Sequence, residues 1–446
     1  MGDQCTLRLM RELRLLQNGD SLAMTVHYNE RDICDIWALM IGSPGTPYAY
    51  GFYQFAIKIP PEYPAKPPRV SIKTTNRGQT RFGPNLYASG KVCLSILGTW
   101  PGKSGEQWSP AQGLESALLS IQSLLSTDPY YNEPGFEKAK LESEDKHVQD
   151  YNSKICHENL RLTVIDPLER ILKLSEEFGP EASSSTLTWH QGVVDDYMKQ
   201  RFIWYLEQYK QTIEEQSQHI SIQKRDKVEF PLTRFESGGN EMRGHWDYQD
   251  LRKRLNTLET RLMEETFLWP AEGVDLVAKD AGIAVNLRGQ HGQIVPQIHR
   301  ITESMAELEM VNDNPFLWRL TYFGRPMTRF DGGVLRIKIY ISPRHPVEQP
   351  RVFFETPIFH IRVSPKGALI YLPARAEEMS RHIEGIITTL EDESPPYNPL
   401  MTVNPEATRL YWGSKEEQRL YNRKLRASIS EATEWAIHIP FLNHVS

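Results

Sequence analysis

A stretch of sequence occurs twice in this chain of 446 residues, once near each end. Residues 57–70 align without a gap with residues 339–352, and seven of the fourteen positions are identical. A repeat of this kind constrains the fold more than any other feature, because two similar segments indicate two similar folding units.

Both segments begin within a predicted strand and continue into a run of prolines. Apolar residues alternate with polar ones in each copy, at Tyr53, Phe55, Ile57 and Ile59 and again at Leu335, Ile337, Ile339 and Ile341. This alternation is typical of a strand with one buried face. The prolines that follow cannot donate to a strand ladder, so they end the pairing. Each copy predicts a helix, about four antiparallel strands and further helices, an α+β fold present twice.

The region between the two copies is predicted to be helical. Its large apolar residues have the spacing of a helix that packs against another surface: Tyr197, Phe202, Tyr205, Leu206 and Tyr209. A second helix is predicted from about Tyr248 to Glu265. Residues 267–292 are rich in glycine and aperiodic, which predicts a linker.

The predicted organisation therefore has four parts: a first copy over residues 1–165, a helical C-terminal extension of that copy over 166–266, a linker over 267–292, and a second copy over 293–446.

Composition narrows the classes of function. The net charge of -6 and the absence of a basic tail give no reason to expect nucleic acid as a partner. The four cysteines are widely spaced and form no C-x-x-C pair, so we expect a reducing compartment and no metal site. No apolar run is long enough to span a membrane. We therefore expect an intracellular protein, cytoplasmic and/or nuclear, without membrane contact and without a cofactor.

One segment has the pattern of a known active site. Pro84 and Asn85 precede Cys93, and a Trp-Ser-Pro sequence at residues 108–110 follows it. This arrangement resembles the active-site segment of ubiquitin-conjugating enzymes. Residues 98–100, 132–137 and 244–249 resemble the Z-type branch of that family, over residues 1 to about 265. Residues 295 to about 435 look like a second copy of the same fold, a four-stranded antiparallel meander flanked by helices.

The resemblance implies a transferase with a thioester intermediate. Cys93 would accept ubiquitin, or a ubiquitin-like modifier, from an activating enzyme and pass it to a lysine amine, with a ubiquitin ligase or directly to a protein substrate. That chemistry needs thiolate character and an exposed shelf. Asn85 would donate its amide to the developing oxyanion, and Glu133 would orient the lysine and accept its proton. The alternatives are a core thiol, a loop-holding amide and a solvated acid.

Contacts with partner proteins are implied as well. Arg8 and Arg11 lie on a first helix of the kind that docks the activating enzyme, although such arginines can also form an ordinary solvated face. Pro110 and Ala111 are implied ligase contacts. Ser109 has the pattern of a helix N-cap, with Pro110 at the first helical position.

The chain departs from the family pattern at two places. Gly83 stands where the family usually has a histidine that stabilises the loop, and it cannot supply that hydrogen bond. In the second copy, His360 and Arg362 stand at the positions of Gly83 and Asn85, and Ile370 at that of Cys93. Isoleucine cannot form a thioester, so this copy is predicted to be a catalytically inactive domain that binds ubiquitin, a substrate or the first copy. The alternative for the whole chain is a non-catalytic ubiquitin-binding scaffold made of two variant domains.

Overall fold

The structure is a computed structural model that describes residues 3–18, 22–103, 105–136, 142–174, 191–223, 225–236, 241–301 and 305–438. The chain forms two compact units, and each is discontinuous in sequence. Residues 1–194 and 211–258 make the first unit, and residues 195–210 and 259–446 make the second. None of the helices in the described ranges is long and apolar enough to cross a membrane.

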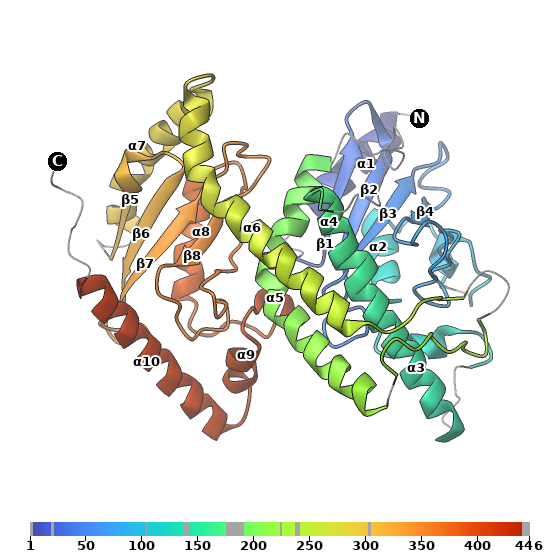
Figure 1. Ribbon diagram of the computed structural model, residues 1–446. Helices are drawn as coiled ribbons and strands as arrows, with labels where there is room; N and C mark the ends of the chain where they lie inside the picture. The colour runs from blue at the N-terminus through green and yellow to red at the C-terminus, as the bar shows by residue number, and fades with distance from the viewer. Residues whose placement is uncertain are drawn as a thin grey trace. The chain divides into compact units, whose positions relative to one another are not determined.

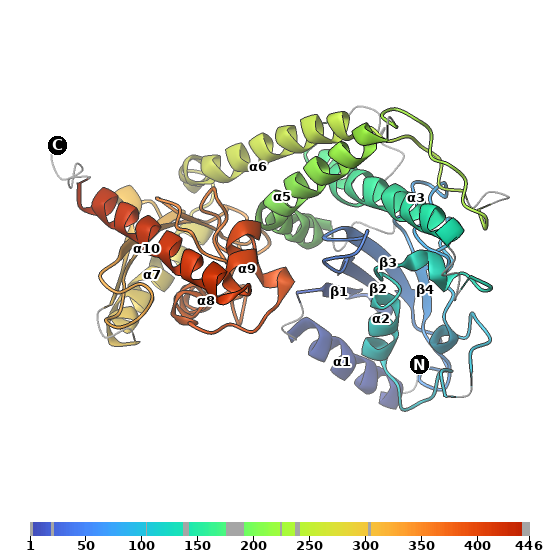
Figure 2. The ribbon, with the colours of Figure 1, turned by 90° about the horizontal axis from the view of Figure 1, so that it is seen from below.

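The first unit contains a four-stranded antiparallel meander, drawn in blue in Figure 1. Its strands follow chain order: β1 (Met24–Asn29), β2 (Asp32–Ile41), β3 (Phe52–Lys58) and β4 (Arg69–Ile72). Helix α1 (Asp3–Asn18) packs beside β1 and beside α2 (Leu114–Gln122), as Figure 2 shows. The core includes Leu9 and Leu13 of α1, which are almost completely buried.

The second unit repeats this arrangement. Its strands are β5 (Ala306–Met310), β6 (Leu317–Phe323), β7 (Val334–Tyr340) and β8 (Arg351–Phe354), again paired in chain order. Helix α7 (Gly282–Ile301) packs beside β5 and α8 (Met379–Glu391), as α1 does beside β1 and α2. Leu335, Ile337 and Ile339 on β7 are fully buried, so the predicted alternation is confirmed.

The remaining helices complete each unit. In the first unit these are α3 (Glu142–Glu158), the π-helix η3 (Asn159–Ile165) and α4 (Asp166–Ile171), with short 3-10 turns η1 (Ser95–Leu97) and η2 (Pro129–Asn132). In the second unit they are α9 (Pro405–Tyr411) and α10 (Lys415–His438), with η5 (Val311–Asp313) and η6 (Pro399–Met401). Helix α10 packs on β7.

Helix α2 begins later than its sequence predicts. Its N-cap is Gly113, not Ser109, and no side chain of its own segment caps it. Instead, Glu12 of α1 accepts a hydrogen bond from the backbone N–H of Leu114 at 2.9 Å. Ser109 and Gln112 form a turn ahead of the helix, in which the Ser109 N–H donates to Gln112 Oε1 at 2.8 Å. A carboxylate from another helix satisfies the free N–H group, so the local capping pattern does not decide the start.

Two long helices contribute residues to both units: α5 (Gln191–Ile222) and α6 (Tyr248–Val277). At the start of α6, the Asp247 N–H donates to Nε2 of His157 on α3 at 3.0 Å, and the ring of Tyr248 packs against that histidine with centroids 5.1 Å apart. Trp246 is fully buried. The motif at residues 244–249 therefore fixes the beginning of α6 on α3 within the first unit.

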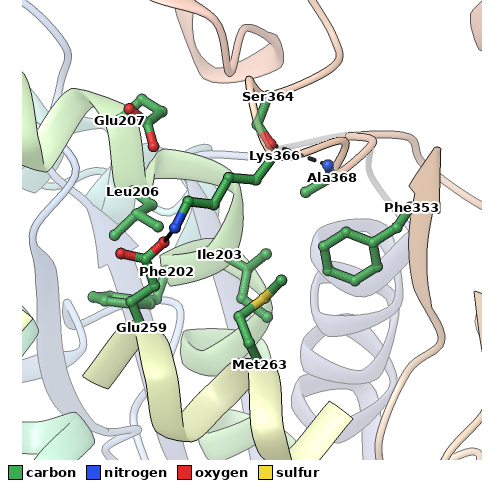
Figure 3. A pocket seen from close by; sticks show the side chains of 10 residues that line it. All are labelled: Phe202, Ile203, Leu206, Glu207, Glu259, Met263, Phe353, Ser364, Lys366 and Ala368. Carbon is green, nitrogen blue, oxygen red and sulfur yellow. Dashed lines mark hydrogen bonds and ion pairs between the residues drawn. The ribbon is translucent and has the colours of Figure 1, made fainter. Parts of the chain in front are cut away.

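The middle of α5 is part of the second unit. Asp196 forms an ion pair with Arg351 of β8 at 2.5 Å, and both side chains are at most 3% exposed. The Tyr205 hydroxyl donates to the Leu400 carbonyl at 2.9 Å. In Figure 3, side chains from α5, α6 and β8 surround a small apolar pocket, and Lys366 reaches across it to Glu259. The prediction that this aromatic helix packs on another surface is confirmed.

The predicted linker is wrong, because residues 267–292 are mostly helical. Helix α6 continues to Val277 and α7 begins at Gly282. Burial explains why helix persists through Pro270: Trp269 is 1% exposed and Leu287 is fully buried. Gly273 is needed for close packing, since a Cβ there would lie 2.3 Å from the Phe316 ring. At Gly273, therefore, the glycine serves close packing within a helix and does not mark a linker.

Candidate active site

Cys93 lies in the loop between β4 and η1, and its backbone is paired with Asn85. The Cys93 N–H donates to the Asn85 carbonyl at 2.9 Å, and Asn85 Nδ2 donates to the Cys93 carbonyl at 2.9 Å. Two of the three residues predicted to carry the chemistry are therefore brought together by three-dimensional contacts. Asn85 Oδ1 is buried without a hydrogen-bond partner.

The Cys93 thiol is buried, contrary to the prediction of an accessible nucleophile. Cys93 is 3% exposed, where an exposed shelf is predicted. Thr99 contributes to this closed arrangement by bonding to both neighbours of the cysteine: its hydroxyl donates to the Val92 carbonyl at 2.7 Å and accepts from the Leu94 N–H at 2.9 Å. A residue six positions downstream thus fixes the backbone on either side of Cys93.

Arg81 holds the loop where the family histidine is missing. Its side chain is almost fully buried. Nε donates to the Gly83 carbonyl at 3.1 Å, and Nη2 donates to the Pro84 carbonyl at 2.6 Å. Nη2 also forms an ion pair with Glu133 Oε2 at 3.0 Å. One guanidinium therefore connects the loop before Asn85 with the acid predicted to meet the lysine.

Tyr48 supports the same loop from the other side. Its hydroxyl, fully buried, donates to the Phe82 carbonyl at 2.6 Å. A Cβ on Gly83 would lie 3.2 Å from that hydroxyl oxygen, so the tyrosine occupies space beside the position of the missing side chain. Burial raises the pKa of Tyr48, which keeps the hydroxyl a proton donor.

Glu133 reaches the active-site loop through Arg81. It follows η2, and its side chain is 22% exposed, so the carboxylate faces both the guanidinium and solvent. The two aromatic residues on either side of it, Tyr130 and Phe136, pack against each other with ring centroids 5.5 Å apart. Glu133 therefore lies in a segment whose ends are packed against each other.

The predicted partner-binding residues are not equivalent. Arg8 is used internally: Nη1 donates to the Pro110 carbonyl at 2.7 Å, and Nε forms an ion pair with Glu12 at 2.8 Å. Arg11, Pro110 and Ala111 are exposed. Arg8 therefore joins α1 to the segment that carries the two predicted ligase contacts.

The loop in the second copy has the same backbone pairing. The Ile370 N–H donates to the Arg362 carbonyl at 3.0 Å, just as Cys93 donates to Asn85. Ile370 is fully buried. Arg362 forms an ion pair with Asp392 at 2.8 Å. Burial lowers the pKa of His360 to about 3, so this ring is neutral.

None of the four cysteines, Cys5, Cys34, Cys93 and Cys156, takes part in a disulfide. Within the ranges that the structure describes, no three His, Cys, Asp or Glu side chains are grouped so that they could hold a metal ion. Burial raises the pKa of Cys156 to about 12, so this thiol stays protonated.

Comparison with known proteins identifies the family. The model of the family described as ubiquitin-conjugating enzyme matches residues 8–158 and 293–428, which together are more than half of the chain. The chain belongs to the ubiquitin-conjugating enzyme family, and both sheets have its fold. The two matched ranges agree with the two copies that the repeat predicts.

Relatives place the chain near one branch of that family. Ubiquitin-conjugating enzyme E2 Z of Xenopus tropicalis is 38% identical over 264 residues, which are 59% of this chain and 74% of the relative. The E2 Z of Homo sapiens is 35% identical over 286 residues, 64% of this chain and 71% of the relative. The human dual conjugating enzyme and ligase BIRC6 is 36% identical over 153 residues, 34% of this chain and 3% of that protein.

Three residues that hold the active-site loop have no role predicted from the sequence: Arg81, Tyr48 and Thr99. Thr99 lies inside a motif that the sequence does single out, and Arg81 lies four residues before Asn85. What Arg81 and Tyr48 share is a polar side chain that is buried in the folded protein. The burial of a single polar residue cannot be predicted from a local sequence pattern.

Proposed function

We propose that the chain carries ubiquitin, or a ubiquitin-like modifier, as a thioester on Cys93 and transfers it to a lysine amine. The observation that supports this most strongly is the pairing of Cys93 with Asn85 in a conjugating fold. The thiolate attacks the activated carbonyl and releases the activating enzyme's thiol. A lysine amine then attacks the thioester carbonyl, loses its proton and releases the Cys93 thiol, and in this proposal the Asn85 amide stabilises the oxyanion that forms on the way.

The test is formation of an adduct that reductant removes. The full chain is incubated with ATP, an activating enzyme and a modifier, and the products are separated on a non-reducing gel. The wild type should give a band that disappears with a thiol reductant, and Cys93→Ser should give one that resists it, because the thiol displaces a thioester by exchange but does not cleave an oxyester. If no Cys93-dependent band forms with any activating enzyme, the chain is a non-catalytic scaffold.

Of the two arginines predicted to contact the activating enzyme, Arg11 is the one whose side chain is available for that contact. It is exposed, whereas Arg8 is bonded to Glu12 and Pro110. We expect Arg11→Glu to slow loading by removing a steering charge, with an effect that weakens as salt is raised. Glu30→Arg, at an exposed position after β1, is the charge-reversal control.

The second copy is proposed to be an inactive domain that binds a partner, ubiquitin included. A fragment that begins near residue 290 would not test this, because Arg351 would lose its buried ion pair with Asp196 of α5. Calorimetry should use the full chain with Cys93→Ala, titrated with ubiquitin. The role would be supported if Asn85→Ala leaves ubiquitin binding unchanged and substitutions on β5 and β6 weaken it.

A further inference from the structure

One aromatic side chain of the C-terminal extension packs against the residues that hold the active-site loop. Phe235 lies in the segment Pro231–Glu236, which lies between α5 and α6. Its ring centroid is 5.8 Å from the guanidinium carbon of Arg81. It is also 5.1 Å from the ring of Tyr130 and 5.6 Å from that of Phe136, the two aromatics that flank Glu133. Phe235 therefore packs on both parts of the predicted lysine-transfer site.

The segment is itself anchored by a buried ion pair. Lys154 of α3 is fully buried and pairs with Glu236, which is 1% exposed. The same ammonium donates to the Pro231 carbonyl at 2.9 Å, and Glu236 accepts from the Thr233 N–H at 2.7 Å. A charge pair that is buried and fully hydrogen-bonded fixes a single geometry, because breaking it leaves an uncompensated charge. The turn that carries Phe235 is thus held rigidly on α3.

The Arg81 guanidinium makes several interactions at once. Its planar fork is shared between two backbone carbonyls and the Glu133 carboxylate, and its face lies 4.5 Å from the Tyr87 ring centroid. Lysine could not replace it, because a single ammonium cannot match that planar set of acceptors. Without the fork, the Pro84 carbonyl would lose the bond from Arg81, the Gly83 carbonyl would keep its bond from the Leu86 N–H, and Glu133 would lose the group that orients it.

We propose that Arg81 is a positioning residue for lysine transfer and that Phe235, from the C-terminal extension, is a built-in part of the same site. Arg81 takes over the loop-holding role of the histidine that Gly83 replaces, and it also sets the place of Glu133. Phe235 supports Arg81 and the Glu133 loop by packing on the guanidinium and on Tyr130 and Phe136. The proposal rests on the proposed thioester function and deepens it, since it concerns the second step, attack by lysine, and not loading.

The test separates loading from transfer in the full chain. Cys93 is loaded, the activating enzyme is stopped by removing ATP, and the thioester is chased with free lysine or, in parallel, with free cysteine. Arg81→Lys should load within about twofold of the wild type but discharge to lysine about tenfold more slowly, the effect of losing one charge-assisted hydrogen bond. Phe235→Leu should slow lysine discharge about threefold, because an aliphatic side chain fills part of the volume. Discharge to cysteine should be unchanged in both, since a thiol attacks without the help of Glu133.

Matched controls use exposed neighbours: Arg77→Lys on the loop before Arg81, and Leu232→Ala in the turn of Phe235, whose side chain is 63% exposed. Both should behave as the wild type. The proposal is overturned if Arg81→Lys and Phe235→Leu discharge lysine at the wild-type rate. It is also overturned if they lose loading and both discharges equally, which is the sign of a general loss of structure. A wild type that never loads would instead refute the proposed function, and this is seen before the chase begins.

Discussion

The loop around Cys93 and the loop around Ile370 share a backbone but not its supports. Isolated bridges join Gly83 to Leu86 and Leu86 to Val92 in the first copy, and His360 to Val363 and Val363 to Leu369 in the second. Gly90 and Gly367 both take positive φ, 91° and 87°, at the same turn, which explains why each copy has glycine there. The alignment of Cys93 with Ile370 therefore follows the backbone as well as the sequence.

The supports have been exchanged. The first copy has Tyr48 beside Gly83, whereas the second has Phe330 beside His360, with ring centroids 5.9 Å apart. The first copy thus has the Tyr48 hydroxyl and no histidine, whereas the second has the His360 imidazole and a phenylalanine without a hydroxyl. The comparison shows that the loop needs a side chain packed beside it and hydrogen-bond donors for its carbonyls. More than one set of side chains can meet both needs.

The largest expected effect concerns the nucleophile itself. Cys93→Ala should abolish the thioester, and adding Ile370→Cys should not restore it. The second position is fully buried, and Arg362, paired with Asp392, replaces the asparagine amide. A non-reducing gel measures the adduct. A reductant-sensitive band from the double variant would show that the two loops are chemically equivalent.

A second comparison removes the side chains at two aligned positions, Asn85 in the first copy and Arg362 in the second. Asn85→Ala should slow discharge to lysine about 100-fold, the cost of one lost oxyanion donor. Arg362→Ala should leave discharge unchanged, because this side chain serves only its own unit through Asp392. Single-turnover discharge after loading gives both rates. Equal losses in the two variants would contradict the division into one active and one inactive copy.

Acid should weaken the second unit through its buried histidines. Burial lowers the pKa of His360 to about 3 and that of His382 to about 4, from ordinary values near 6.5. Above pH 6.5 both are neutral whether folded or unfolded, so their contribution to stability is complete. As pH falls, the two histidines bind protons in the unfolded state but stay neutral in the folded state. At pH 5 the free energy of unfolding is therefore lower by about 2 kcal/mol for each histidine.

Calorimetry between pH 7.5 and 5 tests this in the full chain. His360→Asn with His382→Gln keeps hydrogen-bonding groups at both positions and removes the titration, so the slope of stability with pH should flatten. In the first unit, burial also lowers the pKa of His27, and His27→Gln is the matched control. A slope that His27→Gln flattens equally would show that the acid sensitivity is not concentrated in the second unit.

The smallest effect is expected from transferring the second copy's supports into the first. Gly83→His alone should destabilise the chain by about 1–3 kcal/mol, because the new side chain meets the Tyr48 hydroxyl. Gly83→His with Tyr48→Phe should recover much of this loss, since the phenylalanine leaves space as Phe330 does. Thermal unfolding and lysine discharge are the measurements. If the double variant is as damaged as the single one, the exchange seen between the copies is not a compensation.

Much of the fold could be predicted from the sequence because its signals are local. Strand alternation around Ile57 and Ile339 and the proline run after each strand are visible within a few residues. The resemblance to the active-site segment of ubiquitin-conjugating enzymes is what singles out Cys93 and Asn85. The start of α2 and the helical state of residues 267–292 could not be, because Glu12 caps α2 from another helix and burial of Trp269 outweighs Pro270.

By itself, the sequence determined that this chain has two conjugating folds and that only one of them has a cysteine at the active position. Tertiary structure alone decided what holds that cysteine's loop: Arg81 and Tyr48 in place of a histidine, and Phe235 from the far end of the first unit. The physical reason is that a strand's periodicity is set by its own residues, whereas a buried guanidinium or carbonyl is satisfied by whichever groups the fold brings near it.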